Sequence, residues 1–542
     1  MPSSTVAMRT FVAFVGCCVA NVAMGQTPSQ KIDELICKPT ANYREIASPV
    51  ATDAEFLRRA TLDLAGIVPS AMEAREFLGD RSPDKRMKLV DRLLSSEAFV
   101  RHWSIVLDGW LMDRRPGIHV KIPEWQEYLR TSLADGKPYD QLVREVLSSD
   151  GADPKHRAPA RFFLDRAVEP NQLTKDIGRL FLGMNLHCAQ CHDHPLVDGF
   201  KQEMYFGIYA FLNRSYLFTD PKEKRSMIAE KGEGDVTFQS VFKPKDTKQT
   251  KPKLPGGSAI AEPNIEKGKE YVRPVKTGER GVPTFSRKSQ LADQIVGHPR
   301  FARATANRIW AALLGRGIVH PIEYDHDDNP PSHPELLDFL AAEFRDGKYD
   351  LKRFVRTIVL SETYQRSSEL KNDGKAPESA VFAFATLRPL TPEQYAWSLL
   401  QATGQLDAER KAMGAKATPQ ALQAKFAGVV QPAIAMLAAP AGEPSFNEFE
   451  ATLEQSLFVK NGKLLDGWLQ PRPGNLTERT AATKSAKEAV EELYLSVLSR
   501  MPGADEAKES EALLQSAGQD RVAAIRSLAW ALLASAEFRF NH

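Results

Sequence analysis

The residues with the most distinctive chemistry are two cysteines and a histidine in the pentapeptide Cys188-Ala-Gln-Cys191-His192. In this C-x-x-C-H spacing the two thiols add across the vinyl groups of haem, and the imidazole that follows reaches the iron as its proximal ligand. The chain has only 5 cysteines and 11 histidines in 542 residues, so chance placement gives the pattern in about one such chain in a thousand. The sequence therefore predicts one covalent c-type haem held by Cys188, Cys191 and His192.

The second axial position of the iron has two local candidates. Met204 offers a thioether, which raises a reduction potential, and His194 offers an imidazole, which lowers it. His194 follows His192 by only two residues, a tether too short to reach the opposite haem face easily, so we interpret it as a turn residue. We predict Met204 as this ligand, with an empty or water-filled position as the alternative.

Other interpretations of the same cysteines exclude haem. Together with His192 and His194, the pair could form a compact zinc or iron site, although consecutive local ligands seldom complete a tetrahedron. A disulfide is the other alternative, either within the pair or between one of its members and Cys37. Otherwise we expect Cys37 to be a small buried residue. So few cysteines exclude a disulfide framework.

The N-terminus has the layout of a secretory signal peptide. Arg9 precedes an apolar run from Phe11 to Val22, and Ala23-Met-Gly25 supplies a small-x-small cleavage site. The run is too short to span a bilayer. We therefore predict that residues 1–25 are removed, that the mature chain begins at Gln26, and that it is periplasmic or secreted. A lipoprotein signal with an acylated Cys17 is the alternative.

Composition describes an ordinary globular protein. The chain has 71 basic and 69 acidic residues and 42% hydrophobic residues, with a mean hydropathy of −0.35. Because basic and acidic residues nearly balance, the composition does not favour nucleic acid as a partner. No segment of the mature chain is apolar enough to cross a membrane. Its length suggests two to four domains.

Hydrophobic periodicity predicts a mainly α-helical fold. One stripe at helical spacing begins near Asn171 and is expected to run straight into Cys188; its members are Leu173, Ile177, Leu180, Phe181 and Met184. A second stripe comprises Val490, Leu493, Tyr494, Val497, Leu498 and Met501. Strands are expected only as short pieces near 236–242.

The amino-acid composition changes between Thr219 and Lys288. This stretch has 12 lysines, several prolines and glycines, and few large apolar residues. We predict an exposed connector between two helical halves, with a docking site for an acidic partner as the alternative.

Similar sequence segments occur near both ends of the chain. Residues 91–99 (DRLLSSEAF) resemble 530–538 (WALLASAEF), and 356–364 (RTIVLSETY) are a looser copy. Upstream, residues 62–69 (LDLAGIVP) resemble 495–502 (LSVLSRMP). We infer a degenerate three-helix module near both ends, in which each unit is a helix, a Pro-containing turn, a helix, a loop and a helix. The spacing is too irregular for a solenoid.

An acidic stretch runs from Glu323 to Asn329. Clustered carboxylates could bind Ca²⁺. We instead expect Ser332 and Glu335 to form a capping box at the start of a helix that buries Leu336, Leu337 and Leu340.

Several long motifs resemble a known pair of domains. Residues 56–69 and 181–195 are similar to the planctomycete cytochrome C-like domain of unknown function (PSCyt-type), and residues 307–319, 329–337, 349–352, 390–394 and 535–542 to the planctomycete-specific domain that usually follows it (PSD-type). The resemblance implies an exported, cytochrome-like, mostly helical protein and supplies no reaction. One departure is local: the family tends to place a Trp and an acid after the His-Pro pair, whereas this chain reads GFKQEM over 199–204.

We therefore predict a signal peptide (1–25), a cytochrome C-like helical domain (26–218), a connector (219–288) and a second helical domain (289–542). The predicted function is electron transfer through haem, with an unidentified redox partner. The alternatives are an extracytoplasmic enzyme that uses haem or another metal, and a non-catalytic scaffold in which the cysteine pair is structural.

Overall fold

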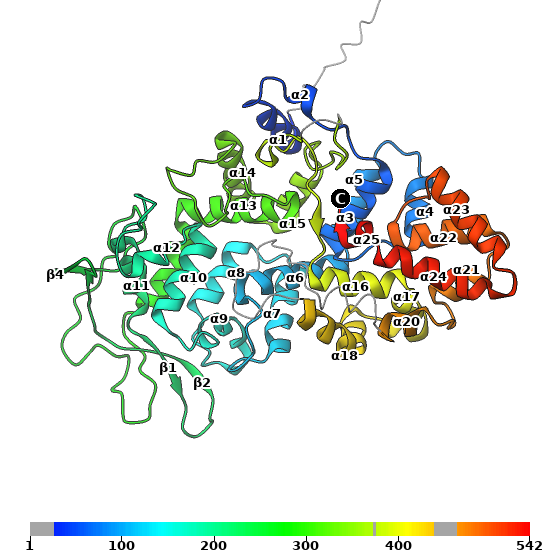
Figure 1. Cartoon of the computed structure of the whole chain (residues 1–542). Helices are drawn as coiled ribbons and strands as arrows, with labels where there is room; N and C mark the ends of the chain where they lie inside the picture. Colours follow the sequence, from blue (N-terminus) through cyan, green and yellow to red (C-terminus); the bar gives the residue numbers. More distant parts are fainter. Residues whose placement is uncertain (1–25, 372–375, 438–462) are drawn as a thin grey trace, which may run out of the picture.

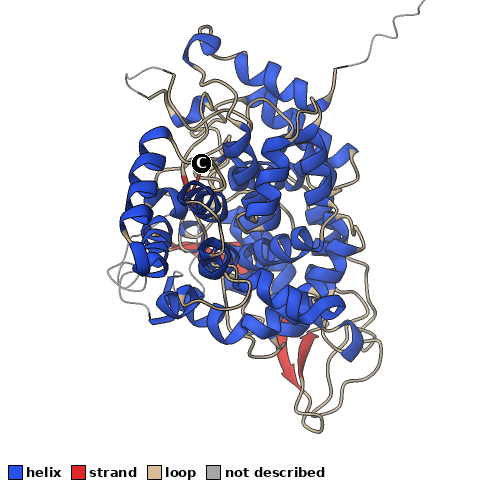
Figure 2. Cartoon of the chain, turned by 90° about the vertical axis from the view of Figure 1, so that its right-hand side faces the viewer, coloured by secondary structure: helices blue, strands red, loops and turns tan. Residues whose placement is uncertain are grey.

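The computed structural model describes residues 26–371, 376–437 and 463–542. The predicted signal peptide, including Cys17, lies outside the described residues. Helices dominate the described chain (Figures 1 and 2), as the hydrophobic periodicity predicts. None of the described helices is both long and apolar enough to cross a bilayer.

The first half is helical and is followed by two antiparallel hairpins, β1–β2 and β3–β4. Its elements are α1 (Pro28–Cys37), α2 (Tyr43–Ile46), α3 (Asp53–Ala65), α4 (Ala71–Gly79), α5 (Lys85–Leu94), α6 (Glu97–Met112), α7 (Ile122–Ala134), α8 (Tyr139–Ser148), α9 (Arg161–Leu164), α10 (Pro170–Leu182), α11 (Gln202–Leu212), β1 (Ser215–Thr219), β2 (Ser226–Glu230), β3 (Val236–Ser240) and β4 (Lys243–Thr250).

The second half is helical except for the small pair β5–β6. Its elements are α12 (Arg287–Gly297), α13 (Pro299–Leu314), α14 (Pro334–Asp346), α15 (Leu351–Val359), β5 (Arg388–Pro389), α16 (Pro392–Ala402), α17 (Gln405–Met413), α18 (Pro419–Leu437), α20 (Lys463–Leu469), α21 (Leu476–Ala481), α22 (Ala486–Leu498), α23 (Ala504–Ser516), α24 (Arg521–Ala534), α25 (Ala536–Arg539) and β6 (Phe540–Asn541). Short 3-10 turns occur at Pro154–His156, Ala158–Ala160, Cys188–Gln190, Ser379–Val381, Gly414–Lys416 and Gly518–Asp520.

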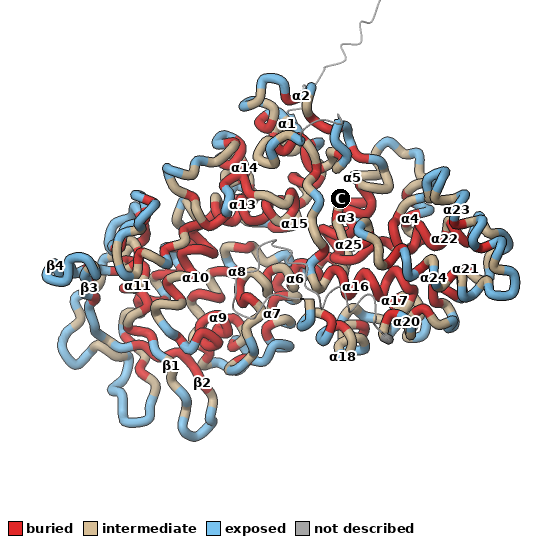
Figure 3. Tube along the Cα trace, viewed as in Figure 1, coloured by how far each residue is buried: buried red, intermediate tan, exposed pale blue. Residues whose placement is uncertain are grey.

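One large hydrophobic core draws on both sides of the predicted connector. Trp103 of α6, Ile228 of β2 and Trp310 of α13 all belong to it, and the buried stretches of these helices form the interior in Figure 3. A second, smaller core is built by α16 and α20–α25. It also takes in Leu62 and Val68 from the first half, so the two ends of the chain share a core.

The connector is not uniformly exposed, which corrects the prediction for 219–288. Every residue of β2 is buried, because β2 pairs with β1 and the amide of Ile228 donates to the carbonyl of Asp150. At the other end of the connector, Lys288 is buried and its ammonium group donates to the carbonyls of Leu147, Ser148 and Ser149, where it caps the C-terminal end of α8. β4, by contrast, is exposed at every residue except its last.

The similar sequence segments near both ends of the chain correspond to a repeated local structure. α3–α4–α5 and α22–α23–α24 follow the same order of helix, Pro-containing turn, helix, loop and helix. All three copies also close in the same way: a serine Oγ accepts from the amide of an aromatic residue three positions later, in the pairs Ser96–Phe99, Ser361–Tyr364 and Ser535–Phe538. The second predicted hydrophobic stripe ends at Leu498, where α22 also ends. Met501, predicted as its last member, lies beyond the helix and is 47% exposed.

The turn after α3 depends on a glycine. Gly66 has φ 71° and closes the helix through its amide, and a Cβ placed there would lie 2.4 Å from Nδ1 of the buried His102. Both the left-handed backbone and the close approach of α6 therefore require glycine.

We expect Gly66→Ala to lower the free energy of unfolding by about 2–5 kcal/mol, since it combines left-handed strain with a clash in a packed interior. Gly79→Ala is the matched control: it ends α4 with no atom within 4 Å of the added Cβ, so its stability should stay within about 1 kcal/mol of the parent. Urea denaturation measures both. Equal losses in the two variants would contradict this explanation.

Candidate haem-attachment site

The loop that carries the cysteines starts where α10 stops. The predicted stripe is buried, but the helix does not run into Cys188: α10 ends at Leu182, and Gly183 follows it with φ 66°. At this position the amide of Met184 donates to the carbonyl of Gly178. The prediction of a continuous helix is wrong because a left-handed glycine reverses the chain.

Cys188, Cys191 and His192 lie on a single helical turn. The 3-10 turn Cys188–Gln190 is closed by the amides of Cys191 and His192, which both donate to the carbonyl of Cys188, at 3.3 and 3.4 Å. Both thiols are free; Cys188 is half-buried and Cys191 is exposed. The turn therefore carries all three predicted residues within five positions, without a disulfide.

The tautomer of His192 follows from its hydrogen bond. Its Nδ1 lies 2.6 Å from the backbone carbonyl oxygen of Asp193. A carbonyl only accepts, so Nδ1 carries the proton and Nε2 keeps a lone pair. Within the described chain no partner occupies that lone pair. A histidine held at Nδ1 by a backbone carbonyl is the arrangement in which Nε2 binds a metal.

His194 has the opposite tautomer. The amide of Leu196 donates to its Nδ1 at 3.2 Å, so the proton lies on Nε2 and this ring offers no free lone pair. Burial lowers its pKa, and the neighbouring His326 and His192 lower it further. This geometry agrees with the interpretation of His194 as a turn residue.

A hairpin from the connector packs against the motif. The amide of Val241 donates to the carbonyl of Cys191 at 3.0 Å, and the ring of Phe242 lies 5.1 Å from the ring of His192. The hairpin is held in place by Phe238, which stacks on Phe206 of α11 with ring centroids 4.5 Å apart. Phe242 is 77% exposed. Sequence reasoning missed its contact with His192, because fifty residues separate Phe242 from the motif.

The acidic stretch of the second half forms the other wall of the loop. The amide of Asn185 donates to the carbonyl of Glu323 at 2.8 Å, and that of Asp325 donates to the carbonyl of Gly183 at 3.1 Å. His326 packs edge-on against Phe200, with ring centroids 5.2 Å apart. Its side chain is 8% exposed, and its Nδ1 has no hydrogen-bond partner in the described residues.

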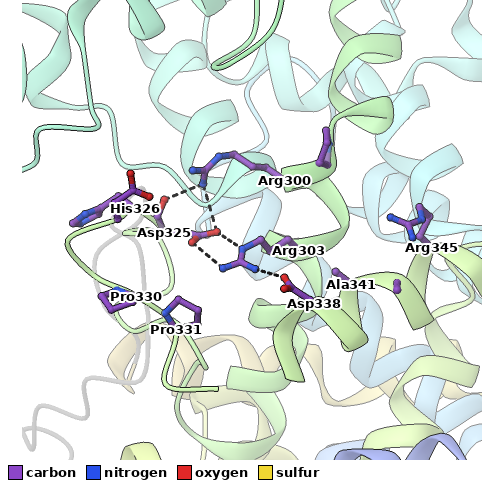
Figure 4. Close-up of a pocket in the computed structure, with 12 residues that line it drawn as sticks. Arg300, Arg303, Asp325, His326, Pro330, Pro331, Asp338, Ala341 and Arg345 are labelled. Carbon is purple, nitrogen blue, oxygen red and sulfur yellow. Dashed lines mark hydrogen bonds and ion pairs between the residues drawn. The ribbon is translucent and has the colours of Figure 1, made fainter. Parts of the chain in front are cut away.

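A cleft of about 620 Å³ opens on the far side of His326 (Figure 4). Asp325 forms ion pairs there with Arg300 and Arg303, and Arg303 also pairs with Asp338. Within the described ranges no group of three or more His, Cys, Asp or Glu side chains is arranged to hold a metal ion. The described residues therefore provide no support for a calcium site in the acidic stretch, or for a compact zinc or iron site at the cysteine pair.

The predicted capping box is wrong. α14 begins at Pro334 with His333 as its N-cap, and no side chain caps it. The amide and the hydroxyl of Ser332 both donate to the carbonyl of Ile318. The hydroxyl predicted to cap the helix is therefore engaged in a tertiary hydrogen bond. The three predicted leucines of α14 are buried as expected.

Two predicted residues lie at the edge of this site. Met204 is in the first turn of α11 and is partly buried against the main core; its role as an iron ligand stays a prediction. Cys37 ends α1 as a free, half-buried thiol packed against the same core, and burial raises its pKa.

Two family models match the chain. One is PSCyt2, described as a protein of unknown function (DUF1549), over residues 31–216, and the other is PSD1, a protein of unknown function (DUF1553), over 287–514. The chain therefore carries a PSCyt2 domain followed by a PSD1 domain. The two matches confirm the order of the domains inferred from the motifs. Comparison with the curated proteins and with the solved structures gave no match.

Buried charges join the PSCyt2 domain to the PSD1 domain behind the motif. Arg179 of α10 forms ion pairs with Asp113 and Asp176, and it donates to Glu323 of the PSD1 domain at 3.4 Å. Burial alone raises the pKa of Asp176, but the guanidinium groups of Arg166 and Arg179 outweigh it and hold that pKa at about 2. Asp176 therefore stays ionised at neutral pH, and the ion pairs of Arg179 hold the segment at Glu323 against the motif loop.

We expect Arg179→Met to lower the free energy of unfolding by about 3–5 kcal/mol, because the buried Asp113 loses its nearest cationic partner and Asp176 keeps only its other arginine partners. Hydrogen exchange at the Asn185 amide, which bonds to Glu323, should accelerate with it. Arg345→Met is the control: this side chain is 57% exposed and pairs only with Asp346, and its effect should stay within about 0.5 kcal/mol. Urea denaturation and exchange mass spectrometry test this, and unchanged Asn185 exchange would refute the link to the motif loop.

Proposed function

We propose that the chain binds one covalent c-type haem through Cys188, Cys191 and His192, and that it passes single electrons outside the cytoplasm. The observation that carries the proposal is the single turn on which two free thiols and an imidazole with a free Nε2 lone pair occur together. Each thiol S–H adds across one vinyl C=C of the porphyrin, giving a thioether and consuming no other reactant. Bound haem supplies an iron that alternates between ferric and ferrous.

The surroundings of the turn suit a flat apolar cofactor. Phe242 beside His192 is 77% exposed, although a large apolar side chain gains by being covered. A porphyrin attached at Cys188 and Cys191 would cover such surface. His192 would ligate through Nε2, and the carbonyl of Asp193 would keep its ring in the right tautomer.

An extracytoplasmic enzyme is the second candidate, favoured by the cleft behind His326. Its volume falls in the usual range for small-molecule sites, and its arginine and aspartate lining suits a polar ligand. His326 is the link between this cleft and the motif loop. Electron transfer and an enzyme differ in the sixth position of the iron, which an enzyme keeps open and a simple carrier fills.

The haem prediction is tested in a host that matures c-type cytochromes. The purified chain should gain the mass of one haem and give a pyridine haemochrome spectrum. Cys188→Ala/Cys191→Ala should lose both signals, whereas Cys37→Ala, the control, should keep them. His192→Ala should shift the Soret and α bands while the thioethers persist. Absence of haem mass in the parent, matured beside a known cytochrome c, would refute the proposal.

The same preparation separates the two candidates. If Met204 is the sixth ligand, the ferric protein should show a sulfur-to-iron charge-transfer band, be insensitive to azide, and lose that band in Met204→Ala. A ferric spectrum that changes on addition of azide indicates an open position and favours the enzyme.

Export is tested independently of the cofactor. Because residues 1–25 are proposed to be a removable signal, N-terminal sequencing of the mature protein should begin at Gln26. The control is an Arg9→Glu variant, which should accumulate unprocessed because the positive n-region is lost. An intact Met1 on the parent chain, or an acylated Cys17, would contradict the prediction.

A further inference from the structure

We propose that the β3–β4 hairpin and Leu196 form a docking surface for an acidic electron-carrier protein. The inference rests on the proposed function, and it adds a class of partner and the residues that recognise it. The hairpin belongs to the stretch 219–288, which the sequence predicts as an exposed connector.

The hairpin is fixed to the motif by three independent contacts. Val241 donates its amide to Cys191, and the side-chain amide of Gln202 donates to the carbonyls of both Gln190 and Gln239, at 3.3 and 3.1 Å. The stacking of Phe238 on Phe206 anchors its base. A protein that binds the hairpin is therefore held beside the cysteines.

The centre of this surface is apolar and exposed. Leu196 is 85% exposed and Val241 is 59% exposed; Leu196 follows Cys191 in the motif loop, and the amide of Val241 donates to the carbonyl of Cys191. Exposed apolar groups rimmed by polar ones are typical of protein interfaces, in which a dry centre is surrounded by a charged rim.

The rim is basic. Lys243, Lys245 and Lys248 are exposed along β4, which carries Asp246 as its one acid, and within the described residues none of the three lysines forms a salt bridge. The stretch 219–288 has 16 basic and 10 acidic residues, whereas the net charge of the whole chain is only +2. This stretch therefore carries an excess of positive charge, and β4 lies at the edge of the molecule (Figure 1).

These features together favour an acidic protein. Carboxylates of the partner would steer it to the lysines and raise the rate of encounter. An acidic polysaccharide would use the lysines alone, because its sugar acids have no need of an apolar centre.

Flavodoxin, an acidic flavin protein, is the probe. One electron passes from its reduced flavin to the ferric iron, which becomes ferrous, while the flavin is oxidised by one electron. In Lys243→Glu/Lys245→Glu/Lys248→Glu the second-order rate at low ionic strength should fall about tenfold or more, and it should no longer fall as salt is added. The control, Lys267→Glu/Lys269→Glu/Lys276→Glu, makes the same change in net charge on exposed loops of the same stretch and should stay within about twofold. Equal losses in both variants, or none in either, would overturn the proposal.

Carbodiimide cross-linking to flavodoxin reports docking whether or not haem is attached. The expected links join flavodoxin carboxylates to Lys243, Lys245 or Lys248. Links elsewhere, on a chain that carries haem, overturn the docking surface and leave the proposed function intact. Links at these lysines on a chain without haem overturn the proposed function alone. Leu196→Ser should also slow the reaction; an unchanged rate, together with competition by alginate, would assign the surface to an acidic polysaccharide and overturn the proposal.

Discussion

The arrangement around the motif depends on one buried ion network, in which Arg179 neutralises Asp113 and Asp176 and reaches Glu323. All four side chains are largely removed from water, where an unpaired charge would cost several kcal/mol. The pairing therefore leaves α10 and the segment at Glu323 little freedom to move apart. Since the motif loop begins directly after α10 and is bonded to that segment, the position of the cysteines depends on this network.

The motif then takes its surroundings from three distant parts of the chain. The loop itself provides the thiols and His192, the connector provides Val241 and Phe242, and the PSD1 domain provides His326. Backbone hydrogen bonds make two of these junctions, at Cys191 and at Asn185. Backbone contacts place little demand on residue identity, so this environment tolerates changes in sequence that would be hard to recognise as functional. In this chain both domains contribute residues around the motif loop.

The ends of the chain are held together in a similar way. Arg58 of α3 is fully buried and donates to the carbonyls of Val497 and Phe538, and Arg59 donates to the carbonyl of His542. Arg58 thereby satisfies backbone acceptors near the ends of α22 and α25. The repeated modules thus pack against each other through charges on the first of them. A shared core at Leu62 and Val68 completes the contact.

Local patterns in the sequence determined the helical class, the buried stripes of α10 and α22, the repeated serine turn, and the spacing of Cys188, Cys191 and His192. These depend on periods of three to four residues, which the chain displays directly. The order of the two domains was also readable, from their long motifs. The end of α10 is set locally by Gly183, whose left-handed backbone the helical period does not reveal. Tertiary structure alone decided which group Ser332 bonds, that β2 is buried, and that Phe242 and His326 flank the motif. Each of these depends on a partner at least 14 residues away, and neither spacing nor composition encodes such pairings.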